Sequence, residues 1–272
     1  MLKYLDYTID ELRPYINWAY FYHAWGLSGK PQTEKERMLN DANNMLDTFG
    51  GRYRTHAVLG LFDANSVGDD LLLGNTRLPM LRQQHPTSDG APNLCLADFV
   101  RPLSSGIADK AGCFATTVDA AMERDFTGDD YLRMLSQTLA DRLAEATAEI
   151  LHLQVRRSFW GYAPDENLSI RELLREEYQG IRPAIGYPSL PDTSVNFILD
   201  QLLDMKRIGI RLTESGAMKP HASVSGLMFA HPKAKYFDLG KIGDDQLRDY
   251  ARRRHIPLEL ARRFLASRLQ YK

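Results

Sequence analysis

A proline-rich segment in the second half of the chain carries the side chains best suited to bind a small anion. It reads Arg182-Pro-Ala-Ile-Gly-Tyr-Pro-Ser-Leu-Pro, and its three prolines fix φ while its glycine can adopt positive φ. Arg182 offers a planar guanidinium that matches a carboxylate or a phosphate, and Tyr187 adds an aromatic ring. A stiff backbone with these two groups is typical of a preformed small-molecule site. The alternative is a surface loop in which Arg182 pairs with a neighbouring acid, Glu176 or Glu177.

The common catalytic signatures are absent from the sequence. It contains neither GxGxxG nor GxxxxGK[ST], so neither a dinucleotide fingerprint nor a P-loop is predicted. The nearest approach to a nucleophile elbow, Ser223-Val-Ser-Gly, has Ser223 where the first glycine belongs. The seven histidines form no HxH or HxxxH pair, and no metal site is predicted. Cys95 and Cys113 have no CxxC spacing and suit a reducing compartment.

Composition indicates an ordinary globular protein. Of its 272 residues, 44% are hydrophobic and 25% charged, values that fit one large domain or two small ones. The net charge of −1 argues against nucleic acid or a membrane surface as a partner of the whole chain. No apolar run approaches the roughly 18 residues of a membrane span, and Asp6, Asp10 and Glu11 interrupt any signal-peptide core. We expect a soluble cytoplasmic protein.

Hydrophobic periodicity predicts an α+β domain built around a long helix. Leucines and alanines three and four residues apart predict a helix over 130–160, capped by Asp129 or Asp130 and ended by Gly161. A second helix is predicted over 34–49, before Gly50-Gly51. Shorter helices are predicted over 169–178, 195–206, 244–254 and 257–269, and strands over 57–62, 70–73, 113–118, 210–213, 223–230 and 235–239. This order does not indicate repeated βαβ units, and no linker or internal repeat is visible.

The C-terminal end of the chain is strongly basic. Eight Lys or Arg residues lie between Arg248 and Lys272, against only Asp249 and Glu259. One interpretation is long-range attraction of an acidic partner protein. The other is a pair of solvated amphipathic helices. The arginines concerned are Arg252, Arg253, Arg254, Arg262 and Arg263.

Motifs spread over nearly the whole chain, taken in order, resemble the activation domain of cobalamin-dependent methionine synthase. The longest are Arg182-Pro-Ala-Ile-Gly-Tyr-Pro, Leu212-Thr-Glu-Ser-Gly-Ala-Met-Lys-Pro-His-Ala-Ser-Val-Ser-Gly and Phe229-Ala-His-Pro-Lys-Ala-Lys-Tyr-Phe. Shorter ones include Tyr15-Ile-Asn-Trp and Phe159-Trp-Gly-Tyr-Ala-Pro-Asp-Glu. Because these motifs are unrelated to one another and keep their order, the combination is specific.

The resemblance implies a fold and a function. The fold is a single C-shaped α+β domain over residues 1–272, with a twisted, mainly antiparallel sheet flanked by helices. The implied ligand is S-adenosylmethionine, used in the reductive methylation of cob(II)alamin to methylcobalamin in methionine biosynthesis. The implied partners are a cobalamin-binding protein or module and a flavodoxin-type electron donor. The chain would be a methyltransferase component that acts only with its cobalamin partner.

The folate, homocysteine and cobalamin modules of the family are absent from this sequence. If Met1 is the natural start, the cobalamin is expected on a separate protein. If the chain is an excised piece, those modules were removed with the rest of the enzyme.

The resemblance also transfers a binding site, residue by residue. The arginine that contacts the ligand carboxylate corresponds to Arg182, and the aromatic pair that lines the ligand corresponds to Tyr236 and Phe237. Three positions of the proline-rich segment are expected to frame the same pocket: Ala184, Gly186 and Tyr187. Two acids expected on helices match family acids near the site: Glu145 and Glu176. No catalytic residue is assigned.

The sequence departs from the family where an aspartate contacts the ligand, since Asn17 stands there instead. Asn17 can still accept a hydrogen bond but carries no charge, which predicts binding weaker by roughly tenfold to a hundredfold. The family's Cys-Pro-x-His is replaced by Leu190-Pro-Asp-Thr, and aromatic positions are lost at Gly216 and Met228. These changes leave two alternatives to the enzymatic function: a non-catalytic docking module for a corrinoid protein with a degenerate site, and use of the pocket for another metabolite.

Overall fold

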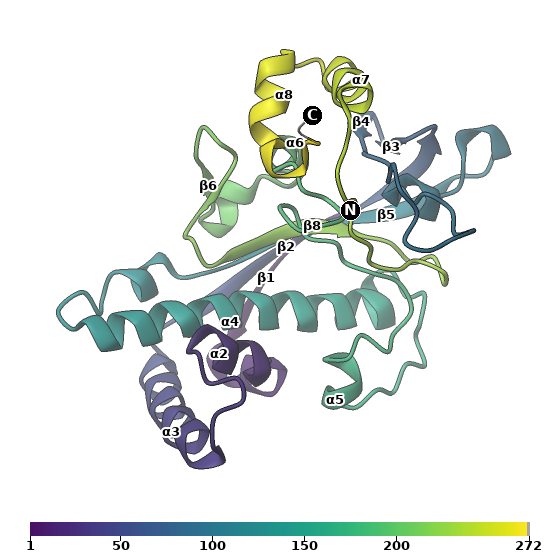
Figure 1. The fold of residues 1–272 in the computed structure, drawn as a ribbon. Coiled ribbons are helices and arrows are strands. Elements are labelled where there is room, and N and C mark those ends of the chain that lie inside the picture. Colours follow the sequence, from purple (N-terminus) through teal and green to yellow (C-terminus); the bar gives the residue numbers. More distant parts are fainter. Residues whose placement is uncertain (271–272) are drawn as a thin grey trace.

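The chain folds around a curled antiparallel sheet, shown in Figure 1. The computed structural model describes residues 1–270. The strand order is β4-β3-β2-β5-β8, and β1 pairs with β2 beside β3. Strands β1 and β3 share one edge of β2, because β1 pairs with residues 54–60 of β2 and β3 pairs with residues 64–67. The strands are β1 (Leu2–Thr8), β2 (Arg54–Val67), β3 (Asp70–Leu73), β4 (Thr76–Pro79), β5 (Asp109–Val118) and β8 (Ser223–Met228), with a separate pair β6 (Arg211–Leu212) and β7 (Met218–Lys219).

The sheet is buried on both faces. Along β2, Leu59 belongs to the core beneath the long helix, whereas its neighbour Val58 belongs to a second core on the opposite face. Phe114 and Ala115 of β5 alternate in the same way. A strand covered on both sides has no need of polar residues at every second position, which explains the nearly continuous apolar runs in these strands.

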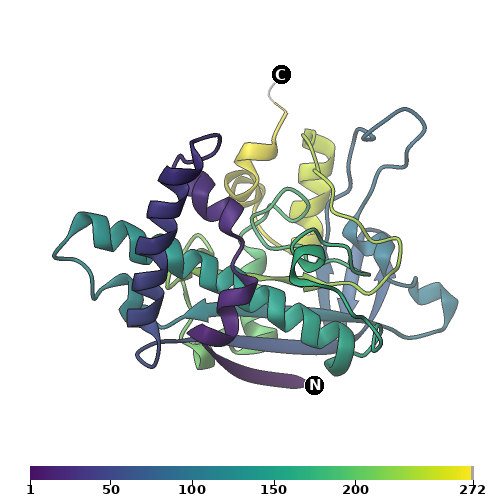
Figure 2. The same ribbon diagram turned by 90° about the horizontal axis from the view of Figure 1, so that it is seen from below.

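The predicted long helix is confirmed as α4 (Asp130–Gln154), which continues into a π turn over Val155–Phe159. Asp129 caps it by accepting a hydrogen bond from the Leu132 N–H, and Gly161 follows its end with φ of +75°. Helices α2 (Trp18–Ala24) and α3 (Gln32–Phe49) lie on the side of α4 away from the sheet (Figure 1). In the view of Figure 2, β1 and β2 lie along the other side of α4.

The remaining α-helices are α1 (Ile9–Leu12), α5 (Ile170–Leu173), α6 (Val195–Leu203), α7 (Asp244–Arg254) and α8 (Leu258–Phe264). Short 3-10 turns cover Arg13–Tyr15, Leu96–Phe99, Leu103–Ser105, Ala120–Glu123, Met205–Ile208 and Ala266–Arg268. The prediction for α7 is confirmed at both ends. Among the described residues, no helix is both long and apolar enough to cross a membrane.

Two predicted elements are wrong. The helix expected over 169–178 ends at Leu173, and Glu176 lies outside it with φ of +60°, a left-handed conformation that no helix continues through. No strand forms over 235–239. The outer edge of β8 is occupied by the proline-rich segment, through bridges from Ile181 to Phe229 and from Ala184 to Gly226, and offers no room for a further strand there.

Much of the basic C-terminal end is engaged within the fold. Arg253 forms ion pairs with Asp70 and Asp249, and Arg254 donates a hydrogen bond of 2.7 Å to the Ser194 hydroxyl. Arg252 and Arg262 pair with acids of α7. The arginines of α7 and α8 that the solvent reaches most are Arg248, Arg252 and Arg263, and Lys272 lies outside the described residues.

A histidine on the sheet makes stability depend on pH. His56 Nδ1 lies 2.6 Å from Asp6 and Nε2 lies 3.1 Å from Asp119. Burial lowers the pKa of His56, but the two carboxylates outweigh it and raise the pKa above its usual range. The stabilisation is therefore fully present below about pH 6.5 and is lost as the pH rises through the raised pKa. We expect a loss of about 1 kcal/mol, because both acids are partly exposed.

Urea denaturation at pH 5.5, 7.0 and 8.5 measures this loss. His56→Gln is the control, and its free energy of unfolding should change less over the same range. An equal pH dependence in the two proteins would contradict the assignment.

Candidate functional site

One face of α4, continued by the π turn after it, carries a row of polar side chains, of which the sequence analysis singled out only Glu145. They are spaced four, four, three and four residues apart, which places them on one side of a helix. Three of them are almost fully buried, so another part of the chain must cover this face. The row consists of Asp141, Glu145, Glu149, His152 and Arg156.

The proline-rich segment is held against β8 by backbone hydrogen bonds. The Ile185 N–H donates to the Ser225 carbonyl at 2.9 Å, and the Leu227 N–H donates to the Pro183 carbonyl at 3.1 Å. The segment then turns at Gly186, whose φ of +89° uses the conformational freedom expected of this glycine. A side chain at Gly226 would not fit, since its Cβ would lie 2.3 Å from the Pro183 carbonyl oxygen.

Gly226→Ala is therefore expected to lift this segment off the strand. We expect a loss of about 1–2 kcal/mol in the free energy of unfolding, in the lower part of the overpacking range because the segment can move. Gly128→Ala is a matched control, since a Cβ at Gly128 would meet nothing within 4 Å. Chemical denaturation of both variants measures the difference, and an equally small effect of the two would show that the close approach carries no cost.

Arg182 points from this segment to the buried row on α4. Its Nη2 lies 2.6 Å from Glu149 Oε2 and its Nη1 lies 3.3 Å from Glu149 Oε1, a bidentate pair. The two side chains are only 13% and 5% exposed. Arg182 does pair with an acid, as the alternative interpretation expected, but the acid is neither Glu176 nor Glu177. Glu149 lies 33 positions away in the sequence, and only the packing of α4 against β8 brings it close.

A second group of buried or partly buried side chains packs around the Arg182 guanidinium and restrains it. The Tyr178 hydroxyl accepts a hydrogen bond from Arg182 Nη1, and the Arg156 guanidinium lies 3.9 Å from the centre of the Tyr178 ring. Arg156 is fully buried and forms a bidentate pair with Glu166 at 2.7 and 2.8 Å. Burial, together with Arg182 and Arg156, lowers the pKa of His152 well below its usual value. His152 is therefore neutral, and its Nδ1 can accept from Arg182 at 3.4 Å.

Other predicted site residues surround Arg182. The Tyr236 hydroxyl accepts a hydrogen bond of 3.0 Å from the Arg182 backbone N–H, and its ring is partly exposed. The Tyr187 hydroxyl donates to Glu145 at 3.1 Å, and the adjacent carboxylate, with burial, raises the pKa of Tyr187 to about 12. The structure thus brings together a guanidinium, two phenols and an acid from α4.

Three predicted site residues make no hydrogen bond or ion pair with Arg182 among the described residues. Phe237 is 8% exposed and packs in the core on the far face of the sheet from α4, which leaves little of its ring for a ligand. Glu176 is exposed on the turn after α5. Asn17 caps α2, and its Oδ1 accepts a hydrogen bond of 3.1 Å from the Ala19 N–H. The oxygen that the sequence analysis assigned to a ligand therefore already accepts one hydrogen bond from the backbone.

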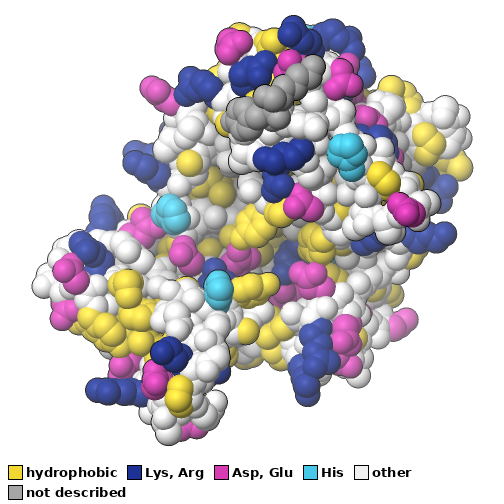
Figure 3. Space-filling view, in the orientation of Figure 1, with side chains coloured by type: hydrophobic (Ala, Val, Ile, Leu, Met, Phe, Trp, Pro, Cys, Tyr) yellow, Lys and Arg dark blue, Asp and Glu magenta, His cyan; other side chains and the backbone are white. Residues whose placement is uncertain are grey.

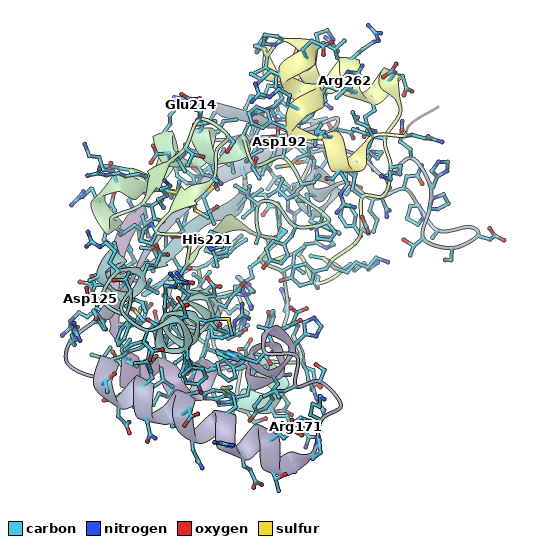
Figure 4. The ribbon with its side chains drawn as sticks, turned by 60° about the vertical axis from the view of Figure 1, so that its left-hand side comes forward. Asp125, Arg171, Asp192, Glu214, His221 and Arg262 are labelled. Carbon is cyan, nitrogen blue, oxygen red and sulfur yellow. The ribbon has the colours of Figure 1, made fainter. Side chains whose placement is uncertain are left out.

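A cavity of about 230 Å³ lies beside Tyr187, between α4 and β8. Figure 3 shows the molecule hollowed between the part formed by α2 to α4 and the part formed by α7 and α8. His221, labelled in Figure 4, stands at the cavity's exposed rim. Residues 1–270 contain no cluster of three or more His, Cys, Asp or Glu side chains able to hold a metal ion. The cavity is lined by Asp141, Glu145, Ile185, Tyr187, His221 and Ser225, among others.

This fold and its polar cleft define an α+β domain with a candidate site for a small charged molecule. Residues 8–255 match the family described as vitamin B12 dependent methionine synthase, activation domain, and the chain belongs to that family. The crystal structure of the MetH reactivation domain bound to AdoHcy (S-adenosylhomocysteine) is similar over 100% of this chain and 91% of that chain, at 42% identity and a TM-score of 0.94. The predicted family and fold class are confirmed.

Proposed function

We propose that this chain binds S-adenosylmethionine at Arg182 and in the neighbouring cavity between α4 and β8, and that it supports the reductive methylation of cob(II)alamin to methylcobalamin, in methionine biosynthesis. The observation that carries the proposal is the full-length similarity, at 42% identity, to a domain described with AdoHcy bound. AdoHcy is S-adenosylmethionine without its transferable methyl group, so a pocket shaped for one suits the other. When bound, S-adenosylmethionine supplies a methyl group on a positively charged sulfur.

The side chains present fit the charged parts of such a ligand. Among the described residues, Arg182 Nε has no hydrogen-bond partner and can donate to the ligand carboxylate. The faces of Tyr187 and Tyr236 can attract the sulfonium. Glu145 adds a negative charge that suits the ligand's ammonium or sulfonium group. Ala184 and Gly186 flank Ile185, which lines the cavity, and contribute backbone beside it.

The proposal needs two partners. One is a cobalamin-binding protein or module, which the membership of a B12-dependent enzyme family supports. The other is a flavodoxin-type electron donor. Arg248 and Arg263, with Arg252 beside its partner Asp249, are the most exposed arginines of α7 and α8 and could attract an acidic donor, because Arg253 and Arg254 are engaged within the fold.

Isothermal titration with S-adenosylmethionine and with AdoHcy tests the proposal. We expect saturable one-to-one binding in the micromolar range, and weaker binding of 5′-methylthioadenosine, which lacks the amino-acid end. A folded chain that releases no heat with either of the first two ligands would contradict the proposal.

The second candidate function is a docking module for a corrinoid protein with a degenerate site. Asn17 favours it, since an amide replaces the family's carboxylate there and its oxygen caps α2. Such a module would bind the corrinoid protein but not S-adenosylmethionine, so the same titration separates the two functions.

A further inference from the structure

Tyr178 stands between two arginines of different depth. The guanidinium of the fully buried Arg156 lies 3.9 Å from the centre of its ring, and its hydroxyl accepts a hydrogen bond from the less deeply buried Arg182. The edge-to-face packing of His152, with ring centres 5.0 Å apart, restrains it from another side. A ring restrained in this way holds its hydroxyl in one place.

Arg156, which packs on the Tyr178 ring, is itself held in place by a buried ion pair. This side chain is fixed by the bidentate pair with Glu166, whose carboxylate is 7% exposed. Arg156 lies in the π turn that follows α4, and Glu166 lies in the loop beyond it. The position of the Tyr178 hydroxyl is thus set by the end of α4, not by the turn that carries Tyr178.

The hydroxyl and Glu149 together determine how the Arg182 guanidinium lies. Nη1 contacts both the Tyr178 hydroxyl and Glu149, and Nη2 contacts Glu149. Among residues 1–270 this leaves Nε as the nitrogen without a partner. An arginine side chain otherwise loses considerable rotamer entropy when it binds a ligand, so fixing it in advance favours binding.

We propose that Tyr178, clamped by Arg156, is a positioning residue that holds the Arg182 guanidinium ready for the carboxylate end of an S-adenosyl ligand. The inference rests on the proposed function. It predicts a selective effect, since a ligand without a carboxylate gains nothing from the orientation of Arg182.

Tyr178→Phe tests this by removing the hydroxyl while keeping the ring beneath Arg156. We expect its affinity for AdoHcy to fall about tenfold, the size of one charge-assisted hydrogen bond. Its affinity for 5′-methylthioadenosine should equal that of the parent. Tyr162→Phe is the matched control, since it removes a hydroxyl that contacts His152 at 3.2 Å and not Arg182, and it should change neither affinity.

A readout independent of ligand is the Arg182 Nε–H resonance, whose exchange with water should quicken severalfold in Tyr178→Phe but not in Tyr162→Phe. The positioning role would be overturned if Tyr178→Phe lost affinity equally for AdoHcy and for 5′-methylthioadenosine. It would also be overturned if neither affinity nor the exchange rate changed. In both cases, binding of AdoHcy by the parent protein would still support the proposed function. A folded parent that does not bind AdoHcy would overturn both.

Discussion

Replacing Arg182 by alanine is expected to weaken the binding of AdoHcy more than a hundredfold and to lower the free energy of unfolding by about 3–5 kcal/mol. The loss of stability arises because Glu149, 5% exposed, would keep a buried charge without its bidentate partner. The loss of binding arises because Arg182 is the side chain proposed to hold the ligand carboxylate. Titration calorimetry measures the loss of binding, and urea denaturation measures the loss of stability.

A double variant separates these two effects. In Arg182→Ala with Glu149→Gln the unpaired charge is gone, so most of the stability should return while binding stays lost. Glu149→Gln alone keeps the guanidinium but makes its partner neutral, and serves as the matched control. Recovery of AdoHcy binding in the double variant would show that Arg182 acts only on stability and does not contact the ligand.

The fold could be predicted where a single face of an element was buried or its ends were capped. The helix α4 has a clear apolar periodicity and Asp129 at its start, and α7 begins after Gly243 and ends as predicted. The segment after Ser169 has an equally good start, a capping box with Glu172. It ends after one turn, and the chain beyond it places Tyr178 against Arg156 and Arg182, contacts that no local pattern contains.

The site shows the same division between local and distant information. The residue types around Arg182 could be predicted, because they lie in one short segment. Its pairing with Glu149 could not, because it depends on the register between α4 and β8. One signal was used only at Glu145: polar residues at helical spacing from Asp141 to Arg156, beside the apolar row, predict a helix face covered by a polar network.

Asn17→Asp is expected to strengthen the binding of S-adenosylmethionine by roughly tenfold to a hundredfold, because it adds a negative charge opposite the ligand's ammonium group. In the structure, the Asn17 carbonyl caps α2 and its amide offers only N–H donors, which do not suit an ammonium. An aspartate can cap the helix with one oxygen and present the other to the ligand. The free energy of unfolding should therefore stay the same or rise by a few tenths of a kcal/mol.

Asn17→Ser is the matched control for this gain, since serine caps a helix without adding charge and should leave the affinity at the parental level or below. The gain should also be absent with 5′-methylthioadenosine, which has no ammonium group. If Asn17→Asp binds S-adenosylmethionine no more tightly than the parent, residue 17 does not face the ammonium group. If the parent is silent and Asn17→Asp binds, a single residue accounts for a degenerate site, and the docking function becomes the better description of this chain.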